Sequence, residues 1–173
     1  RLFCNVAGGG FEGPIYLVNP KGGEIAGRPV FTSVVEIPEP VDLAVVTIPA
    51  AKVRDLIPQF KEKKIKNMLL ITSGFAETGA EGRRLEEELV QAAREADILI
   101  LGPNTMGICN PYATLFCCGS NVRPKPGATT IVSQSGNLGV QLLDFAEHEG
   151  VGIRAFGGSG NEAMITIEDY MEA

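Results

Sequence analysis

The sequence predicts an α/β fold in which a largely parallel sheet carries helices on both faces. Two continuous apolar runs, 43–48 and 68–72, are typical of buried strands, and helical patterns follow them. The 173 residues include 21 Gly and 11 Pro, which suits many tight strand-to-helix turns. With 45% hydrophobic residues, the chain can bury a substantial core. Because strand, turn and helix recur in this order, parallel strands are expected.

The sequence predicts only short helices and strands in the first quarter of the chain. Residues 1–8 have a helical pattern that a run of glycines ends, and 14–18 form a short strand. A loop containing Lys21 follows, and 25–31 are expected to be a connector. The chain begins inside a helical pattern and ends in another, so we expect it to be a fragment of a longer polypeptide.

The middle of the chain predicts three strands and two helices. Pro49 ends the strand at 43–48, and a helix begins near residue 50, which Pro58 should kink or shorten. After the strand at 68–72, Thr78 and Glu81 have the spacing of a capping box. The helix they would begin has an apolar face of Leu85, Leu89, Ala92 and Ala96, and a strand at 98–101 follows.

Residues 105–128 are expected to be irregular, and the proline-rich stretch 123–127 resembles a linker. We therefore predict two domains, at 1–123 and 124–173. The second begins with a strand at 129–133, followed by a helix at 137–148, a strand at 151–156, a glycine-rich turn at 157–161 and a helix at 165–173.

The turn Ser133-Gln134-Ser135-Gly136 joins a strand to a helix and has two readings. In the first, Ser135 is a simple helix N-cap, since serine is common there. Alternatively, the unpaired N–H groups and the helix dipole attract a phosphate or carboxylate.

Small, polar or proline-containing turns follow each of five strands. Ligands of parallel α/β sheets bind beyond the carboxyl ends of the strands, which favours a shared binding rim, although turns use these residue types everywhere. The five turns are Asn19-Pro20-Lys21, Pro49-Ala50, Ser73-Gly74-Phe75, Gly102-Pro103-Asn104 and Ser133-Gln134-Ser135-Gly136.

Composition excludes several classes of function. A net charge of −6 argues against nucleic acid as a general partner. Cys4, Cys109, Cys117 and Cys118 form no CxxC pair and only His148 could join them, so no metal site is expected. The adjacent thiols suggest a reducing compartment and buried cysteines. No signal peptide or 18-residue apolar run is present, which predicts a cytoplasmic protein without a membrane partner.

Five stretches together resemble the NDP-forming acyl-CoA synthetases, the superfamily of the succinyl-CoA synthetase α subunit and the ADP-forming acetyl-CoA synthetases. They occur in the family's order and span nearly the whole chain: 16–21 (Tyr-Leu-Val-Asn-Pro-Lys), 38–44 (Pro-Glu-Pro-Val-Asp-Leu-Ala), 72–77 (Thr-Ser-Gly-Phe-Ala-Glu), 101–107 (Leu-Gly-Pro-Asn-Thr-Met-Gly) and 132–136 (Val-Ser-Gln-Ser-Gly). The resemblance implies a Rossmann-like CoA-binding domain, truncated at its N-terminus, followed by the start of a flavodoxin-like ligase domain.

The resemblance also implies roles for individual residues. Lys21 would face the phosphates of coenzyme A. The other positions implied to bind or border coenzyme A are Asn19, Pro20, Ile48, Pro49, Ala50, Ser73 and Gly74. Gly102, Pro103 and Asn104 would line the place where the thioester reacts. Ser135 and Gly136 would receive the phosphate of a phosphohistidine, which agrees with the anion reading of this turn.

Parts of the family's machinery lie outside this sequence. Its glycine-rich phosphate loop precedes the first helix, and its phosphorylated histidine lies further along. His148 stands between two glutamates at a predicted helix end and is read as exposed. The nucleotide (NDP or NTP, with Mg) would bind an ATP-grasp domain or β-type subunit, so an oligomer is implied. The substrates implied are acyl-CoA and phosphate.

The implied reaction is acyl-CoA + NDP + phosphate ⇌ acid + CoA + NTP. One alternative is a sensor module of a GNAT-type protein acetyltransferase, which would bind CoA without ligase catalysis. A second is a stand-alone CoA-binding module. A nicotinamide-dependent dehydrogenase is a remote third, because no acidic residue is placed to hold a ribose. Glu162 either lines the ligase site or begins a helix.

Overall fold

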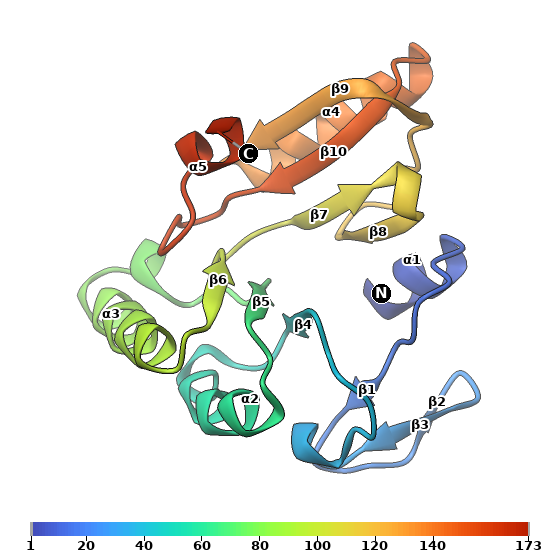
Figure 1. The fold of residues 1–173 in the computed structure, drawn as a ribbon. Coiled ribbons are helices and arrows are strands. Elements are labelled where there is room, and N and C mark those ends of the chain that lie inside the picture. The colour runs from blue at the N-terminus through green and yellow to red at the C-terminus, as the bar shows by residue number, and fades with distance from the viewer. Residues whose placement is uncertain (1, 173) are drawn as a thin grey trace.

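A computed structural model describes residues 2–172 and contains three small sheets with helices packed around them (Figure 1). Their strand orders are β1-β3-β2, β4-β5-β6 and β8-β7-β10-β9. The predicted mixed α/β fold with parallel strands is confirmed, since β4, β5 and β6 pair in parallel and β9 pairs in parallel with β10.

The N-terminal part contains α1 (Leu2–Gly8) and β1 (Leu17–Val18), as the sequence predicted. The expected connector at 25–31 is wrong, because β2 (Glu24–Ile25) and β3 (Arg28–Phe31) form a hairpin whose second strand pairs with β1. Ala26 and Gly27 join them with φ angles of 50° and 75°, the left-handed geometry of a tight two-residue turn.

The central sheet consists of β4 (Ala44–Val46), β5 (Asn67–Leu70) and β6 (Leu99–Leu101). Because the three strands are parallel, their carboxyl ends lie at one edge, where the turns at 48–50, 73–75 and 102–104 follow. Val45 is 39% exposed, since β4 is an end strand of this sheet and not the fully covered strand that its apolar run predicted.

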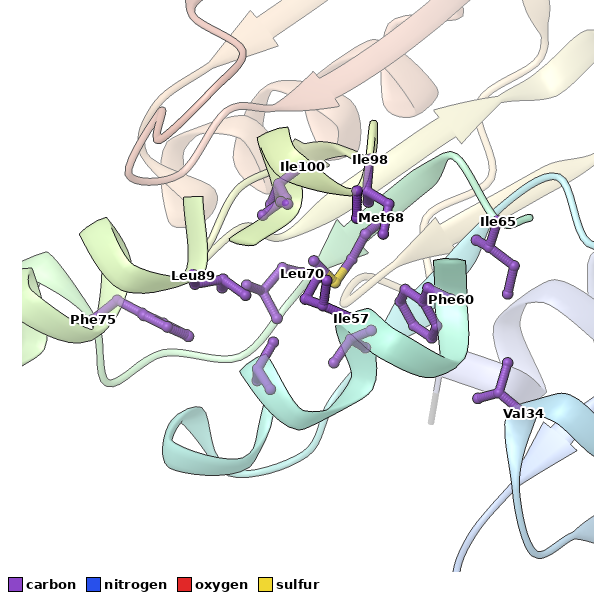
Figure 2. Close-up of a cluster of buried hydrophobic side chains, with 14 of the residues drawn as sticks. Val34, Ile57, Phe60, Ile65, Met68, Leu70, Phe75, Leu89, Ile98 and Ile100 are labelled. Carbon is purple, nitrogen blue, oxygen red and sulfur yellow. The ribbon is translucent and has the colours of Figure 1, made fainter. Parts of the chain in front are cut away.

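Two helices cover the central sheet and complete its core. Short 3-10 turns (Ala50–Lys52 and Arg54–Leu56) precede α2 (Ile57–Lys63), whose first turn contains Pro58. The proline thus shortens the predicted helix, because a prolyl ring is tolerated only in the first turn. Figure 2 shows buried side chains of this core, which come from the strands, from α2 and α3 and from the segments that join them: Val34, Ile57, Phe60, Ile65, Met68, Leu70, Phe75, Leu89, Ile98 and Ile100.

The capping box predicted for α3 (Ala80–Glu95) does not form. Gly79 is the residue before the helix, and no side chain caps the helix there. The Thr78 hydroxyl instead donates to the Phe75 carbonyl at 2.8 Å, and Glu81 pairs with Arg84. The 3-10 turn Ala76–Thr78 moves the start of α3 beyond the position that the spacing indicated.

Residues 105–128 are not irregular throughout, which corrects the prediction. β7 (Gly107–Asn110) and β8 (Leu115–Cys118) form a hairpin, and the Asn110 side chain caps the 3-10 turn Pro111–Ala113 between them. β7 pairs antiparallel with β10, so this sheet contains strands from both sides of residue 123. The division into two domains, at 1–123 and 124–173, stays a prediction.

The last part follows the predicted order of elements. The four elements are β9 (Pro126–Ser133), α4 (Gly136–His148), β10 (Ile153–Gly158) and α5 (Ile167–Glu172). β9 begins within the predicted linker, and β10 includes Gly157 and Gly158, which the sequence assigned to a turn. In Figure 1, α4 lies against the face of β9 and β10. Its buried side chains, Leu143 and Ala146, join a smaller core of six buried residues. Among the described helices, none is both long and apolar enough to cross a membrane.

Candidate functional site

A pocket of about 400 Å³ lies where three strand ends meet. The segment after β5 contributes Ser73, the turn after β6 contributes Asn104, and the turn after β9 contributes Ser135 together with Gly136, the first residue of α4. The pocket therefore joins the turns to which the sequence assigned thioester chemistry and phosphate. The remaining lining residues are Ile71, Thr105, Met106, Gln134 and Gly160.

The start of α4 forms one wall of this pocket. Ser135 is the N-cap, and its hydroxyl accepts a hydrogen bond from the Leu138 amide at 3.3 Å. No hydrogen bond among the described residues uses the amides of Gly136 and Asn137. The capping reading is thus correct as far as it goes, and the same helix start still offers two amides to an anion.

Gly136 is required here by close packing. A Cβ atom at this position would lie 2.4 Å from Cγ of Met106, which is closer than two non-bonded carbon atoms approach. Met106 follows the turn at 102–104, so Gly136 lets the start of α4 contact the part of the chain that carries Asn104. No Lys or Arg is among the described lining residues, so neutral donors supply the pocket's polarity.

The turn at 102–104 forms the opposite wall. Gly102 and Pro103 are buried, and only Asn104 of the three predicted residues lines the pocket. Asn104 has a φ of 57°, and its backbone N–H donates to the Thr72 carbonyl at 2.9 Å. Gly102 and Pro103 therefore hold the backbone from behind while Asn104 faces the open space.

The turns after β4 and β5 contact each other, as expected of neighbouring parallel strands. The Thr72 hydroxyl donates to the Ile48 carbonyl at 2.7 Å, and a Cβ on Gly74 would lie 3.2 Å from that of Ala50. Pro49 and Ser73 are exposed beside these contacts.

Glu77 accepts hydrogen bonds from backbone amides of the Ser73-Gly74-Phe75 turn. Its carboxylate accepts from the amides of Gly74 and Phe75 and from the side chain of Asn161. Partial burial alone would raise the pKa of this carboxyl, but the hydrogen bonds from Asn161 and the turn amides outweigh it and lower the pKa below its ordinary value of 4.5.

The Asn19-Pro20-Lys21 loop lies apart from the pocket. The Asn19 side chain accepts from the Lys21 amide at 2.9 Å, and Lys21 is exposed. Pro20 and Ile48 instead line a second, mostly apolar cavity of about 490 Å³. This cavity lies between β1 and β4, each of which is an end strand of its sheet.

Sequence reasoning missed several residues of the site. Thr105 and Met106 line the pocket just after the predicted turn at 102–104, and Gln134 lines it within the predicted turn at 133–136, but the sequence assigned no role to these three side chains. The glycine-rich turn at 157–161 was recognised without a role. Its Gly160 lines the pocket and accepts a hydrogen bond from the Gln134 side chain at 3.2 Å.

Other candidate groups lie elsewhere. His148 is exposed at the end of α4, as predicted. Cys109, Cys117 and Cys118 are buried, and burial raises the pKa of Cys109 to about 12 and of Cys117 to about 11, so these thiols are poor nucleophiles. Within residues 2–172, no cluster of three or more His, Cys, Asp or Glu side chains could hold a metal ion.

Glu162 does not begin a helix, which corrects one of its two readings. It has a φ of 59°, lies five residues before α5, and accepts a hydrogen bond from the Ser159 hydroxyl at 2.7 Å. It is also absent from the residues that line the pocket.

Two family models match the chain. The model described as "CoA binding domain" matches residues 6–111, and the model described as "Succinyl-CoA ligase like flavodoxin domain" matches residues 126–173.

Named relatives are similar along nearly the whole chain. The acetate–CoA ligase [ADP-forming] I subunit alpha of Pyrococcus furiosus is 41% identical over 94% of this chain and 36% of its own length. The 4-hydroxybutyrate–CoA ligase [ADP-forming] of Nitrosopumilus maritimus is 30% identical over 94% of this chain and 24% of its own. The chain therefore spans about a quarter to a third of these relatives.

A solved structure has the same fold. The dinucleotide-forming acetyl-coenzyme A synthetase 1 of Ca. Korarchaeum cryptofilum, in complex with phosphate and ADP, superposes with a TM-score of 0.92. It is 33% identical, and the match covers 99% of this chain and 36% of that one. The likeness confirms the predicted combination of a Rossmann-like and a flavodoxin-like unit.

Proposed function

Because this chain belongs to the CoA binding domain family and resembles NDP-forming acyl-CoA synthetases along nearly its whole length, we propose that it forms the CoA- and phosphate-binding part of such an enzyme. The reaction is acyl-CoA + NDP + phosphate ⇌ acid + CoA + NTP. The observation that carries the proposal is the pocket that brings Ser73 and Asn104 to the start of α4.

The pocket suits the attack of phosphate on a thioester. Phosphate binds the free amides of Gly136 and Asn137 at the positive end of the α4 dipole. One phosphate oxygen attacks the thioester carbonyl carbon beside Asn104. The new C–O bond forms as the C–S bond breaks, which gives an acyl phosphate and the CoA thiolate. Fixed N–H donors stabilise the phosphate charge without a nearby cation.

Coenzyme A binds along the turns that follow β1, β4 and β5. Lys21 attracts its phosphates, and the small turn residues Pro49, Ala50 and Gly74 let its chain approach the backbone. The family resemblance places a strand and glycine-rich loop ahead of residue 1. We propose that this strand occupies the apolar cavity between β1 and β4, where two sheet ends face one space.

The remaining steps take place on polypeptide outside this chain. A phosphohistidine carries the phosphoryl group from the acyl phosphate to a nucleotide bound with Mg in an ATP-grasp domain or β-type subunit. The relative with phosphate and ADP bound supports ADP as the nucleotide. Relatives named for acetate and for 4-hydroxybutyrate leave the acyl group open. The proposed location is the cytoplasm.

NTP formation tests this proposal. The complete parent polypeptide, with any partner subunit, is supplied with a panel of acyl-CoAs, ADP and phosphate. We expect ATP to form from at least one acyl-CoA, which also identifies the acyl group. Binding of CoA without NTP from any acyl-CoA would favour the sensor module instead and would leave Ser135 in a ligand pocket without turnover.

A further inference from the structure

We propose that Asn161 is a positioning residue that holds the two halves of the pocket at their working distance. This inference rests on the proposed function. It concerns Asn161 and the two carboxylates of Glu77 and Glu86, a cluster that we call the Asn161 latch. Asn161 follows β10, whereas both glutamates belong to the segment between β5 and β6.

The Asn161 amide uses all of its hydrogen-bonding groups across this junction. Its nitrogen donates to Glu77 Oε2 at 2.6 Å and to Glu86 Oε2 at 2.9 Å. Its oxygen accepts from the side-chain nitrogen of Asn104 at 3.3 Å. Only one orientation of the amide fits, because the reverse would point its oxygen at two carboxylates.

The backbone of the same turn binds the opposite wall of the pocket. The backbone N–H of Asn161 donates to the Pro103 carbonyl at 2.9 Å, and the backbone N–H of Ala163 donates to the Gly102 carbonyl at 3.1 Å. The turn at 159–163 is also tied to the phosphate side, since the Ser159 amide donates to the Ser133 carbonyl at 3.0 Å. One turn thus contacts both walls.

The latch connects two sheets that share no strand pairing. The sheet β4-β5-β6 carries Ser73 and Asn104 at its edge, and the sheet β8-β7-β10-β9 carries Ser135. Their relative position depends on contacts such as these. A displacement of about 1 Å between reacting groups can cost roughly 100-fold in rate, so a loosened latch should slow the attack of phosphate.

Glu77 is itself well placed for this role. Its Oε1 accepts from the Gly74 and Phe75 amides, and its Oε2 accepts from the Asn161 side chain and also from the Phe75 amide at 3.2 Å. A glutamine at position 77 could keep the first contact with its oxygen and donate with its nitrogen. The Glu77–Asn161 hydrogen bond can therefore be reversed by Glu77→Gln combined with Asn161→Asp.

The test measures this reversal in the parent protein with any partner subunit. Asn161→Asp places a third carboxylate against two others, and phosphate-dependent release of CoA from its acyl-CoA should fall about 30-fold in kcat, with the Kd for CoA within about twofold. Glu77→Gln should lower kcat in the wild-type background and raise it in the Asn161→Asp background. Asn67→Ala, which loses one hydrogen bond at the far edge of the sheet, is the matched control and should leave kcat unchanged.

Hydrogen exchange provides a second readout that does not need turnover. The amides of Asn161 and Ala163 should exchange at least tenfold faster in Asn161→Asp and recover in the double variant. If wild-type protein releases no CoA but exchange follows this pattern, the proposed function fails and the latch stands. An effect of Glu77→Gln with the same sign in both backgrounds, or exchange unchanged by Asn161→Asp, would overturn the latch.

Discussion

The dipeptide Ser-Gly comes after three strands of this molecule, β5, β9 and β10, and the turns after β5 and β9 differ in what their amides bind. After β5, the amides of Gly74 and Phe75 are occupied by the Glu77 carboxylate of the chain itself. After β9, Ser135 caps α4 and the amides of Gly136 and Asn137 have no acceptor among the described residues. The turn after β5 thus binds a carboxylate of the chain itself, whereas the amides of the turn after β9 remain available to an anion from outside.

The residues that follow each turn explain the difference. Three positions after Gly74 stands Glu77, on a 3-10 turn that delays the next helix to Ala80. Three positions after Gly136 stands Gly139, and the 13-residue helix α4 has already begun. Of these two turns, only the second would offer an external phosphate both free amides and a full helix dipole.

The largest expected effect comes from closing the open turn. Gly136→Val would push a side chain into Met106, and Ser135→Pro would remove the cap hydroxyl. In the complete protein we expect either change to slow phosphoryl transfer at least about 100-fold, since oxyanion donors contribute on that scale. CoA affinity, measured by calorimetry, serves as the internal control and should change by no more than about twofold. Unchanged transfer would remove the phosphate assignment.

A smaller effect is expected from giving the open turn a carboxylate of its own. Leu138 is 52% exposed at the third helical position, where Leu138→Glu completes a capping box with Ser135. The helix should become more stable by about 0.5 kcal/mol while the KM for phosphate rises about tenfold, because the carboxylate competes for the same end of the dipole.

Leu138→Gln is the matched variant, since it can cap without a charge. It should leave the KM for phosphate within about twofold of wild type, because the dipole then meets no competing anion. A rise in KM that is equal for both variants would mean that bulk, and not charge, excludes phosphate.

The side of the molecule that we propose to bind CoA should respond separately. Lys21 is exposed and lies outside the pocket, so Lys21→Ala should weaken CoA binding only about fivefold and less at high salt. The KM for phosphate should not change. Steady-state kinetics at two salt concentrations would check this, and an equal loss of phosphate affinity would argue that Lys21 serves both ligands.

The smallest effect concerns pH at the self-occupied turn. The lowered pKa of Glu77 means that its stabilising contribution is full above about pH 4.5 and is lost as the pH falls through the lower folded-state pKa. Exchange of the Gly74 amide should therefore accelerate in acid beyond the intrinsic trend. Glu77→Gln should abolish this additional acceleration, whereas Glu87→Gln on the exposed face of α3 should retain it.

Much of the fold was predictable because long apolar runs and helical periods mark it. β5, β6, α3 and α4 fall where the patterns placed them. The two hairpins were missed, because β2 and β3 are short and meet at Ala26-Gly27, and because prolines around β7 and β8 suggested loops. Short strands carry little periodicity of their own and form where a neighbouring edge accepts them.

The candidate site was predictable only in part for a related reason. Turn chemistry at strand ends identified Ser73, Asn104 and Ser135, which the structure gathers in one pocket. The contacts of Asn161 with Glu77 and Glu86 join residues 84 and 75 positions apart, and no local pattern reports such pairings. The opposite holds for Lys21. Its loop was recognisable in the sequence, but the structure places it away from this pocket.

The most direct test of the central claim is release of CoA thiol from an acyl-CoA by phosphate with nucleotide withheld. The complete protein is mixed with its acyl-CoA and phosphate, and free thiol is followed through a single turnover. We predict phosphate-dependent release by wild-type protein that Gly136→Val abolishes. Release that needs nucleotide, or that proceeds equally in Gly136→Val, would contradict a pocket in which the start of α4 presents phosphate to the thioester.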